Sequence, residues 1–124
     1  MTVTTESTIY GTEYEQSGFL AGSKDEDVPC AVCRSIKTYT SIMIPGRKTC
    51  YSGWKRGYDG ILASNHVAFR ASSYICIDAK PEFLQGGQEN KNGNLLFITG
   101  SVCGSLPCPP YADHVAVNCV HRFD

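Results

Sequence analysis

The chain has 124 residues and a formal net charge of −1 at pH 7. A nearly neutral chain has no basic field to attract phosphates, so the composition argues against a nucleic-acid-binding protein. No apolar run approaches the roughly 20 residues that span a bilayer, and the first eight residues lack the basic and apolar regions of a signal peptide. The length suits one domain, and the sequence predicts a loose polar arm at 1–8 and a single cysteine-rich domain at 9–124.

Short strands are the predicted elements, because 12 glycines and six prolines interrupt the chain and period-two alternation recurs between them. In chain order, strands are expected over 40–44, 73–78, 94–99 and 115–119. The turn dipeptide Asn92-Gly93 predicts that the third of these opens a hairpin. Helix should be scarce, with at most one turn at 80–84. The pattern predicts an all-β, mostly antiparallel, sandwich-like small domain that is rich in disulfides.

Cysteine is the most informative residue type, with seven copies. This density is typical of a secreted domain held by disulfides or of a zinc-binding module. Seven is an odd number, so at least one sulfur lacks an intrachain disulfide partner and is either free or joined to a second chain. The pairing cannot be derived from the sequence, because six paired cysteines allow 15 patterns. The candidates are Cys30, Cys33, Cys50, Cys76, Cys103, Cys108 and Cys119.

Zinc is the competing hypothesis. The pairs Cys30/Cys33 and Cys103/Cys108 could supply four thiolates to a tetrahedral site. Small zinc modules place their cysteine pairs close together, whereas these two pairs lie far apart in the chain. The remaining three cysteines would also need a separate explanation. Disulfides are therefore the favoured hypothesis.

Several motifs occur in a fixed order along the chain. They are VPCAVCR at 28–34, MIPGR at 43–47, TCYSGW at 49–54, YDG at 58–60, YICID at 74–78 and CGSLPCPPY at 103–111. This order resembles the cysteine-rich C-terminal domain of invertebrate short-chain, spongin-type collagens, and the resemblance covers about residues 9–120. The same family includes a galactose-binding, calcium-dependent lectin type described from sea anemones. The resemblance implies an extracellular protein.

The chain departs from this family in three respects. It has no Gly-X-Y repeat, so it is not itself collagenous. A similar cysteine-containing unit that often precedes the 10–14 segment in relatives is missing. Relatives also tend to end in Cys-X-X-Cys, whereas Cys119 is followed by Val120, His121 and Arg122. The missing last cysteine could leave Cys30 or Cys33 without a partner.

A calcium-dependent lectin needs six to eight oxygen ligands around the ion. The segment 78–94 is the best source of such oxygens, and its glycines would let the loop turn its carbonyls inward. The alternative is a solvated loop in which Asn and Gly only form turns. The predicted metal ligands are Asp78, Glu82, Glu89 and Asn92.

Sugar recognition needs polar groups for hydroxyls and an aromatic face for the apolar side of the ring. Asn65, His66 and Arg70 lie in one predicted loop and can all donate hydrogen bonds to hydroxyls. Tyr58 could stack on a sugar, and Asp59 could accept from a hydroxyl. The alternative is an ordinary exposed loop. Trp54, beside Cys50, is expected in the core rather than in a sugar platform.

The sequence contains no Gly-X-Ser-X-Gly elbow, no His-Glu-X-X-His and no glycine-rich phosphate loop, and we expect no enzyme activity. The predicted function is a secreted lectin for galactose-terminated glycans. Calcium would assist it, with zinc the less favoured metal. Multivalency would come from a homodimer or higher homo-oligomer, which the odd cysteine could link by a disulfide. The alternative is a structural matrix domain that drives chain association and binds no sugar.

Overall fold

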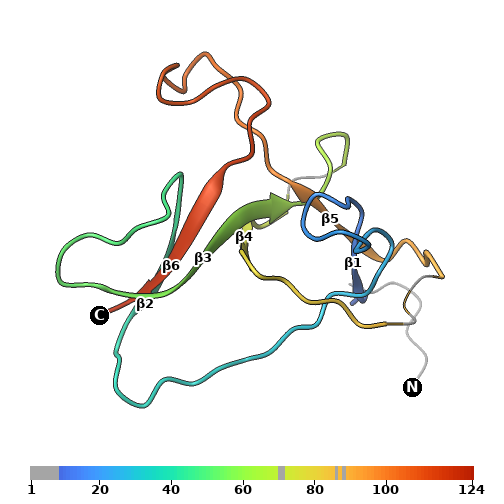
Figure 1. Cartoon of the computed structure of the whole chain (residues 1–124), viewed down its shortest axis with the longest axis horizontal. Helices are drawn as coiled ribbons and strands as arrows, with labels where there is room; N and C mark the ends of the chain where they lie inside the picture. Colours follow the sequence, from blue (N-terminus) through green and yellow to red (C-terminus); the bar gives the residue numbers. More distant parts are fainter. Residues whose placement is uncertain (1–8, 70–71, 86, 88) are drawn as a thin grey trace.

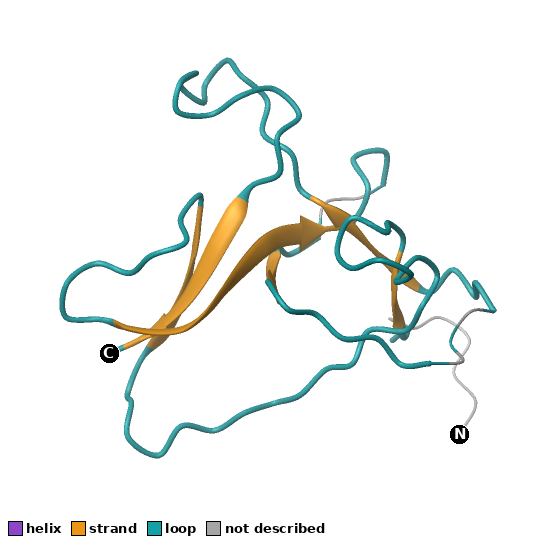
Figure 2. Ribbon diagram, in the orientation of Figure 1, coloured by secondary structure: helices purple, strands orange, loops and turns teal. Residues whose placement is uncertain are grey.

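The computed structural model describes residues 9–69, 72–85, 87 and 89–124, and the predicted arm at 1–8 lies outside this part of the chain. The described residues form strands and loops without a helix, as Figures 1 and 2 show. They accordingly include no helix long and apolar enough to cross a membrane. The all-β class is confirmed. The strands are β1 (Thr12–Tyr14), β2 (Ser41–Pro45), β3 (Lys55–Ser64), β4 (Ile75–Asp78), β5 (Asn94–Ile98) and β6 (Asn118–Phe123).

The six strands join into a single sheet with the order β1-β5-β3-β6-β2, and β4 pairs with β3 beside this path. The strands are thus continuous with one another, where the sequence suggested a sandwich-like pair of stacked sheets. Four of the five strand pairs are antiparallel, and only β1 and β5 run parallel. The prediction of a mostly antiparallel fold is confirmed.

β3 is the central strand, because it pairs with three others. Gly60 and Ile61 are in register with both β4 and β6, and Ala63 is in register with both β4 and β5. A strand has only two edges, so β6 and β5 must follow one another along the edge opposite β4. This arrangement explains why β3 is the longest strand of the described chain and curves through the middle of Figure 1.

Three hydrogen bonds close a ring where β6 gives way to β5 along this edge. The Leu62 N–H donates to the Val117 carbonyl (2.8 Å), the Val117 N–H to the Thr99 carbonyl (2.9 Å), and the Thr99 N–H to the Leu62 carbonyl (2.9 Å). Each of the three residues thereby donates once and accepts once. The ring satisfies backbone groups that the end of a ladder would otherwise leave unpaired.

A disulfide joins Cys76 on β4 to Cys119 on β6. In a flat sheet, the two strands that flank a central strand lie about 9.5 Å apart, which is twice the spacing between neighbouring strands. The Cα atoms of the two cysteines are only 5.8 Å apart, so the sheet bends sharply at this point of β3. Cys119 is in register with Gly60 there. A Cβ atom at Gly60 would overlap the Ile77 carbonyl oxygen, and this position therefore requires glycine.

Two small hydrophobic clusters lie on opposite faces of the sheet. Leu62 and Ala63 are consecutive residues of β3, and their side chains therefore point to opposite sides. The first cluster contains Tyr14, Phe19, Ala63 and Leu96. The second contains Leu62, Cys76 and Cys119, with Met43, Tyr58 and Val117 packed against them. Neither face carries a large continuous core.

Three predicted strands are confirmed with small shifts at their ends, namely those at 40–44, 73–78 and 94–99. The strand expected at 115–119 begins at Asn118 instead, and β1 and β3 were not predicted. No helical turn forms at 80–84, where the Leu84 N–H instead donates to the Asp27 carbonyl (3.0 Å).

The hairpin predicted at Asn92-Gly93 is wrong, because β5 pairs with β1 and β3 rather than with β4. Asn92 does adopt the left-handed conformation (φ 50°) that suits a turn. The buried Glu13 carboxylate accepts from the N–H groups of Lys91 (3.1 Å) and Asn92 (3.2 Å). This turn therefore docks against β1 instead of reversing the chain onto its neighbour.

We expect Gly60→Ala to destabilise the fold strongly. The added methyl group would meet backbone atoms, which cannot move aside as a flexible side chain can. Overpacking of a tight site costs about 1–3 kcal/mol, and a backbone clash should reach or exceed the upper value. Urea unfolding of the oxidised protein would measure the loss. Gly11→Ala is the control, because a Cβ atom there has no neighbour within 4 Å. Equal stability of the two variants would contradict the close approach at Gly60.

Candidate functional site

A surface groove of about 460 Å³ lies at the end of β3, beside β5. Its polar lining includes Asn65 and His66, which directly follow the last residue of β3, and Ser72. Its aromatic lining consists of Phe69, Tyr74 and Phe97. The groove falls within the size range of small-molecule sites, which combine apolar walls with a few placed polar groups.

Hydrogen bonds fix the turn that carries Asn65 and His66. The Asn65 Oδ1 atom accepts from the His66 N–H (2.8 Å), and the His66 Nδ1 atom accepts from the Ala68 N–H (3.1 Å). With Nδ1 engaged as an acceptor, Nε2 is the ring nitrogen that is left to donate. Within the described residues, His66 Nε2 and the Asn65 NH₂ group have no hydrogen-bond partner, and both can donate to a ligand.

A pair of serines closes the base of the loop. The Ser64 and Ser72 hydroxyl oxygens lie 3.0 Å apart, and Ser72 Oγ also accepts from the Asn65 N–H (3.2 Å). Ser64 is buried. This Ser64–Ser72 clasp connects the two ends of the loop and holds Asn65 close to the sheet.

Aromatic rings surround the His66 imidazole. Its ring meets Phe97 edge-on at 4.9 Å between centroids and Phe69 at 5.7 Å. Phe69 and Tyr74 are each 58% exposed, so part of each ring is open to a ligand. The sequence did not single out Phe69, Tyr74 or Phe97 as site residues. Phe69 and Tyr74 lie close to the predicted loop in the sequence. Phe97 reaches the groove only because β5 pairs with β3, and the residues around Phe97 in the sequence give no indication of this pairing.

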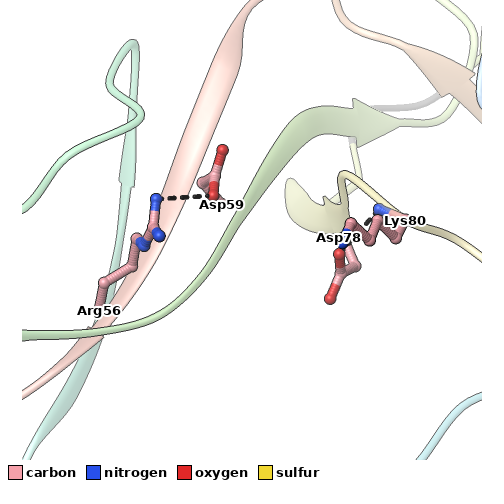
Figure 3. Close-up of polar contacts among 4 residues, drawn as sticks. All are labelled: Arg56, Asp59, Asp78 and Lys80. Carbon is pink, nitrogen blue, oxygen red and sulfur yellow. Dashed lines mark hydrogen bonds and ion pairs between the residues drawn. The ribbon is translucent and has the colours of Figure 1, made fainter.

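The other predicted sugar-binding residues are not brought to this groove, and Arg70 lies outside the described residues. Tyr58 packs into the second hydrophobic cluster, where its hydroxyl donates to the Cys76 carbonyl (3.0 Å). Its ring stacks on His121 at 5.3 Å. Asp59 accepts from Arg56 (3.1 Å), as Figure 3 shows. Because a strand rises about 3.3 Å per residue, Asp59 lies roughly 20 Å along the chain from Asn65.

Three of the four predicted metal ligands make separate local contacts, and the fourth is exposed. Asp78 Oδ1 accepts from the Lys80 N–H (2.8 Å; Figure 3), and Glu89 pairs with the Lys91 ammonium (2.9 Å). The hydrogen bond from Lys91 lowers the pKa of Glu89. Asn92 donates to Glu13 and to the Asn90 carbonyl, and Glu82 is exposed. No group of three or more acidic, histidine or cysteine residues in the described chain is placed to hold a metal ion. The structure does not gather the four predicted ligands into one group.

The cysteines divide into two disulfides and three thiols. Besides Cys76–Cys119, Cys103 is bonded to Cys108. This second bond removes two of the four thiolates that the zinc hypothesis required. Cys30 and Cys33 are exposed thiols, and Cys50 is a half-buried one. The prediction of an odd thiol is confirmed, and the structure leaves three.

The chain matches no protein-family model, no curated protein and no solved structure. Its resemblance to the spongin-type domains therefore rests on the sequence motifs, and function must be argued from the site.

We expect Tyr58→Phe to lower stability by about 1 kcal/mol at neutral pH, because it removes one partly buried hydrogen bond. Burial first, and then the negative charges of Asp78 and Cys30, raise the pKa of Tyr58. The stabilisation is therefore complete below the unfolded tyrosine pKa of about 10 and is lost as pH rises through the higher folded value.

The variant should accordingly lose less stability than the parent when pH rises from about 9 to 11. Denaturant unfolding with blocked thiols would measure both effects. Tyr39→Phe, at a fully exposed side chain, is the control and should change neither. Identical alkaline profiles for the parent and Tyr58→Phe would contradict the assignment.

Proposed function

We propose that the chain is an extracellular carbohydrate-binding protein that holds a galactose-type sugar in the groove at the end of β3. The observation that carries this proposal is the meeting of Asn65 and His66 with two exposed aromatic rings, Phe69 and Tyr74, in one groove. The resemblance to the lectin-containing family supports the choice of sugar. The disulfides support an oxidising, extracellular compartment.

The chemistry of a hexose suits this lining. A hexose has hydroxyls around its edge and C–H groups on its faces, and the axial 4-hydroxyl of galactose leaves one face broadly apolar. That face can pack on Phe69 or Tyr74. The Asn65 amide and the His66 Nε2–H can donate to the hydroxyls at the edge. Because their own hydrogen bonds fix the loop, little conformational entropy is lost when the sugar binds.

One open groove of this kind gives weak affinity, so recognition of cell-surface glycans would require several copies. Linking weak sites can raise the overall affinity about a hundredfold or more. A homo-oligomer, joined covalently through the exposed thiols or held by surface contacts, would supply these copies. Calcium is a separate hypothesis, which the binding experiment addresses directly.

Asn65→Ala and His66→Ala should each weaken galactose binding about three- to tenfold, the value of one net hydrogen bond. Retention on a galactose resin and titration with free galactose would measure this. Asp59→Asn is the matched control and should bind like the parent, because Asp59 lies away from the groove. Unfolding midpoints would establish that each variant is folded. A parent protein that passes through galactose, glucose and mannose resins alike would end the proposal.

A chelator arm of the same experiment tests calcium. Release by the chelator would support calcium assistance through ligands that rearrange on binding. Retention that is indifferent to the chelator would leave the sugar site and remove the metal.

The second candidate function is a matrix domain that drives chain association. It is favoured by residues 30–40, the later part of the segment between β1 and β2, which lie away from the sheet in Figure 1. This segment carries the exposed thiols Cys30 and Cys33 together with the exposed apolar side chains Val32, Ile36 and Tyr39. Exposed thiols do not persist in an oxidising compartment, and apolar side chains at full exposure suit a contact with another chain.

If the segment assembles chains, the oxidised protein should run as a covalent dimer or larger species on a non-reducing gel. Cys30→Ser/Cys33→Ser should run as a monomer, and Cys50→Ser should behave like the parent because Cys50 is half-buried. Intact mass and peptide mapping would identify the bond. A monomer in which Cys30 and Cys33 are joined to each other would rule out covalent assembly through this segment.

A further inference from the structure

A second hollow of about 580 Å³ adjoins the groove of the proposed sugar site. The two hollows share the lining residues Gln16, Ile98 and Gly100. The shared residues lie where three segments meet. The Ile98 N–H donates to Gln16 Oε1 (2.8 Å), which ties the chain after β1 to the end of β5, and Gly100 forms a bridge with Ala116. The residues shared by the two hollows are therefore held in place by Gln16 on one side and by the bridge to Ala116 on the other.

The second hollow has a different chemistry from the first. Glu15, Lys24 and His114 line it, whereas the first hollow has aromatic walls. A carboxylate accepts hydrogen bonds and an ammonium group donates them. A sugar hydroxyl can do both, so a lining of mixed charge suits a neutral, hydroxyl-rich unit better than it suits a single anion or cation. Gln16 contributes at the boundary, because its Oε1 is engaged by Ile98 and its NH₂ group remains a donor.

The volumes of the two hollows also suit a ligand larger than one sugar unit. Grooves of about 300–1,000 Å³ enclose drug-sized molecules, and each hollow alone is within this range. A single hexose is smaller than such molecules and would occupy only one of the two.

We infer that the two hollows form one extended site for a neutral oligosaccharide of at least two sugar units. The terminal galactose-type unit lies beside His66, and the next unit lies beside Lys24 and Glu15. This inference rests on the proposed function, because it assigns the ligand class of the same groove.

Gly100 offers a means of separating the two hollows. A Cβ atom there would lie 3.5 Å from the nearest atom, the Cα of His114, which is an ordinary contact. Gly100 is exposed and does not need the left-handed conformation that only glycine adopts readily. A large side chain can therefore be placed at this boundary without backbone strain, and Gly100→Trp should obstruct a ligand that extends over both hollows.

The test is calorimetric titration of the oxidised full chain with galactose, a β-galactosyl disaccharide and the corresponding trisaccharide. In the parent, the disaccharide should bind about ten- to a hundredfold more tightly than galactose, as two further net hydrogen bonds would give. Gly100→Trp, at a residue that lines both hollows, should lose the gain of the disaccharide over galactose. Gly11→Trp is the control, because it adds the same side chain at an open position outside both hollows. It should keep the gain.

Lys24→Ala gives a second reading that does not depend on how Gly100→Trp folds. It should reduce the disaccharide gain and leave galactose binding unchanged. Measurable galactose binding with no gain for longer sugars in the parent would overturn the extended site and leave the proposed function standing. A folded Gly100→Trp protein that keeps the gain for the disaccharide would also overturn the two-unit arrangement. Failure of the parent to bind any of the three sugars would overturn the proposed function itself.

Discussion

The Cys76–Cys119 disulfide is the constraint on which the remainder of the structure depends. Only eight apolar residues of the described chain are buried, and seven of them are divided between two clusters on opposite faces of one sheet. The bond closes a separation of 43 residues, for which the chain-entropy model gives about 4 kcal/mol. That is a large share of the 5–15 kcal/mol by which domains are usually stable. The Cys103–Cys108 bond, with a separation of five, corresponds to only about 2 kcal/mol and secures one loop.

The crosslink also determines where the candidate site lies. By drawing β4 and β6 together across Gly60, it bends the sheet and leaves the last residues of β3 free to pair with β5. The hydrogen-bond ring at Leu62 fixes that change of partner, and the Ser64–Ser72 clasp fixes the loop that follows. Asn65 and His66 stand directly after this rigid stretch. The polar side chains of the groove are therefore held by the central strand, although they belong to a surface loop.

The sequence predicted those parts of the fold whose cause is local. Alternating apolar residues identified β2, β4 and β5, and the Asn65–His66 loop was recognised by its residue types. β3 was missed because Gly60 and its other glycine and charged residues break the alternation, and the reason for the glycine is contact with a strand distant in sequence. The disulfide pairing and the position of Phe97 in the groove could not be predicted for the same reason. Both depend on which strands become neighbours, and no short window of sequence records that.

A buried cation gives one group of aromatic residues a structural role. Arg122 is 9% exposed, and its Nε and Nη1 atoms have no hydrogen-bond partner within the described chain. It lies 4.1 Å from the Trp54 ring and 5.2 Å from the Tyr51 ring, so cation–π attraction replaces part of its lost hydration. Removing either ring would expose a poorly compensated charge. Trp54 thus holds its loop against β6. It is half-buried and belongs to neither hydrophobic cluster, and Cys50 beside it forms no disulfide, so the core position expected for Trp54 is not observed. Under the proposed function, sugar stacking belongs to Phe69 and Tyr74.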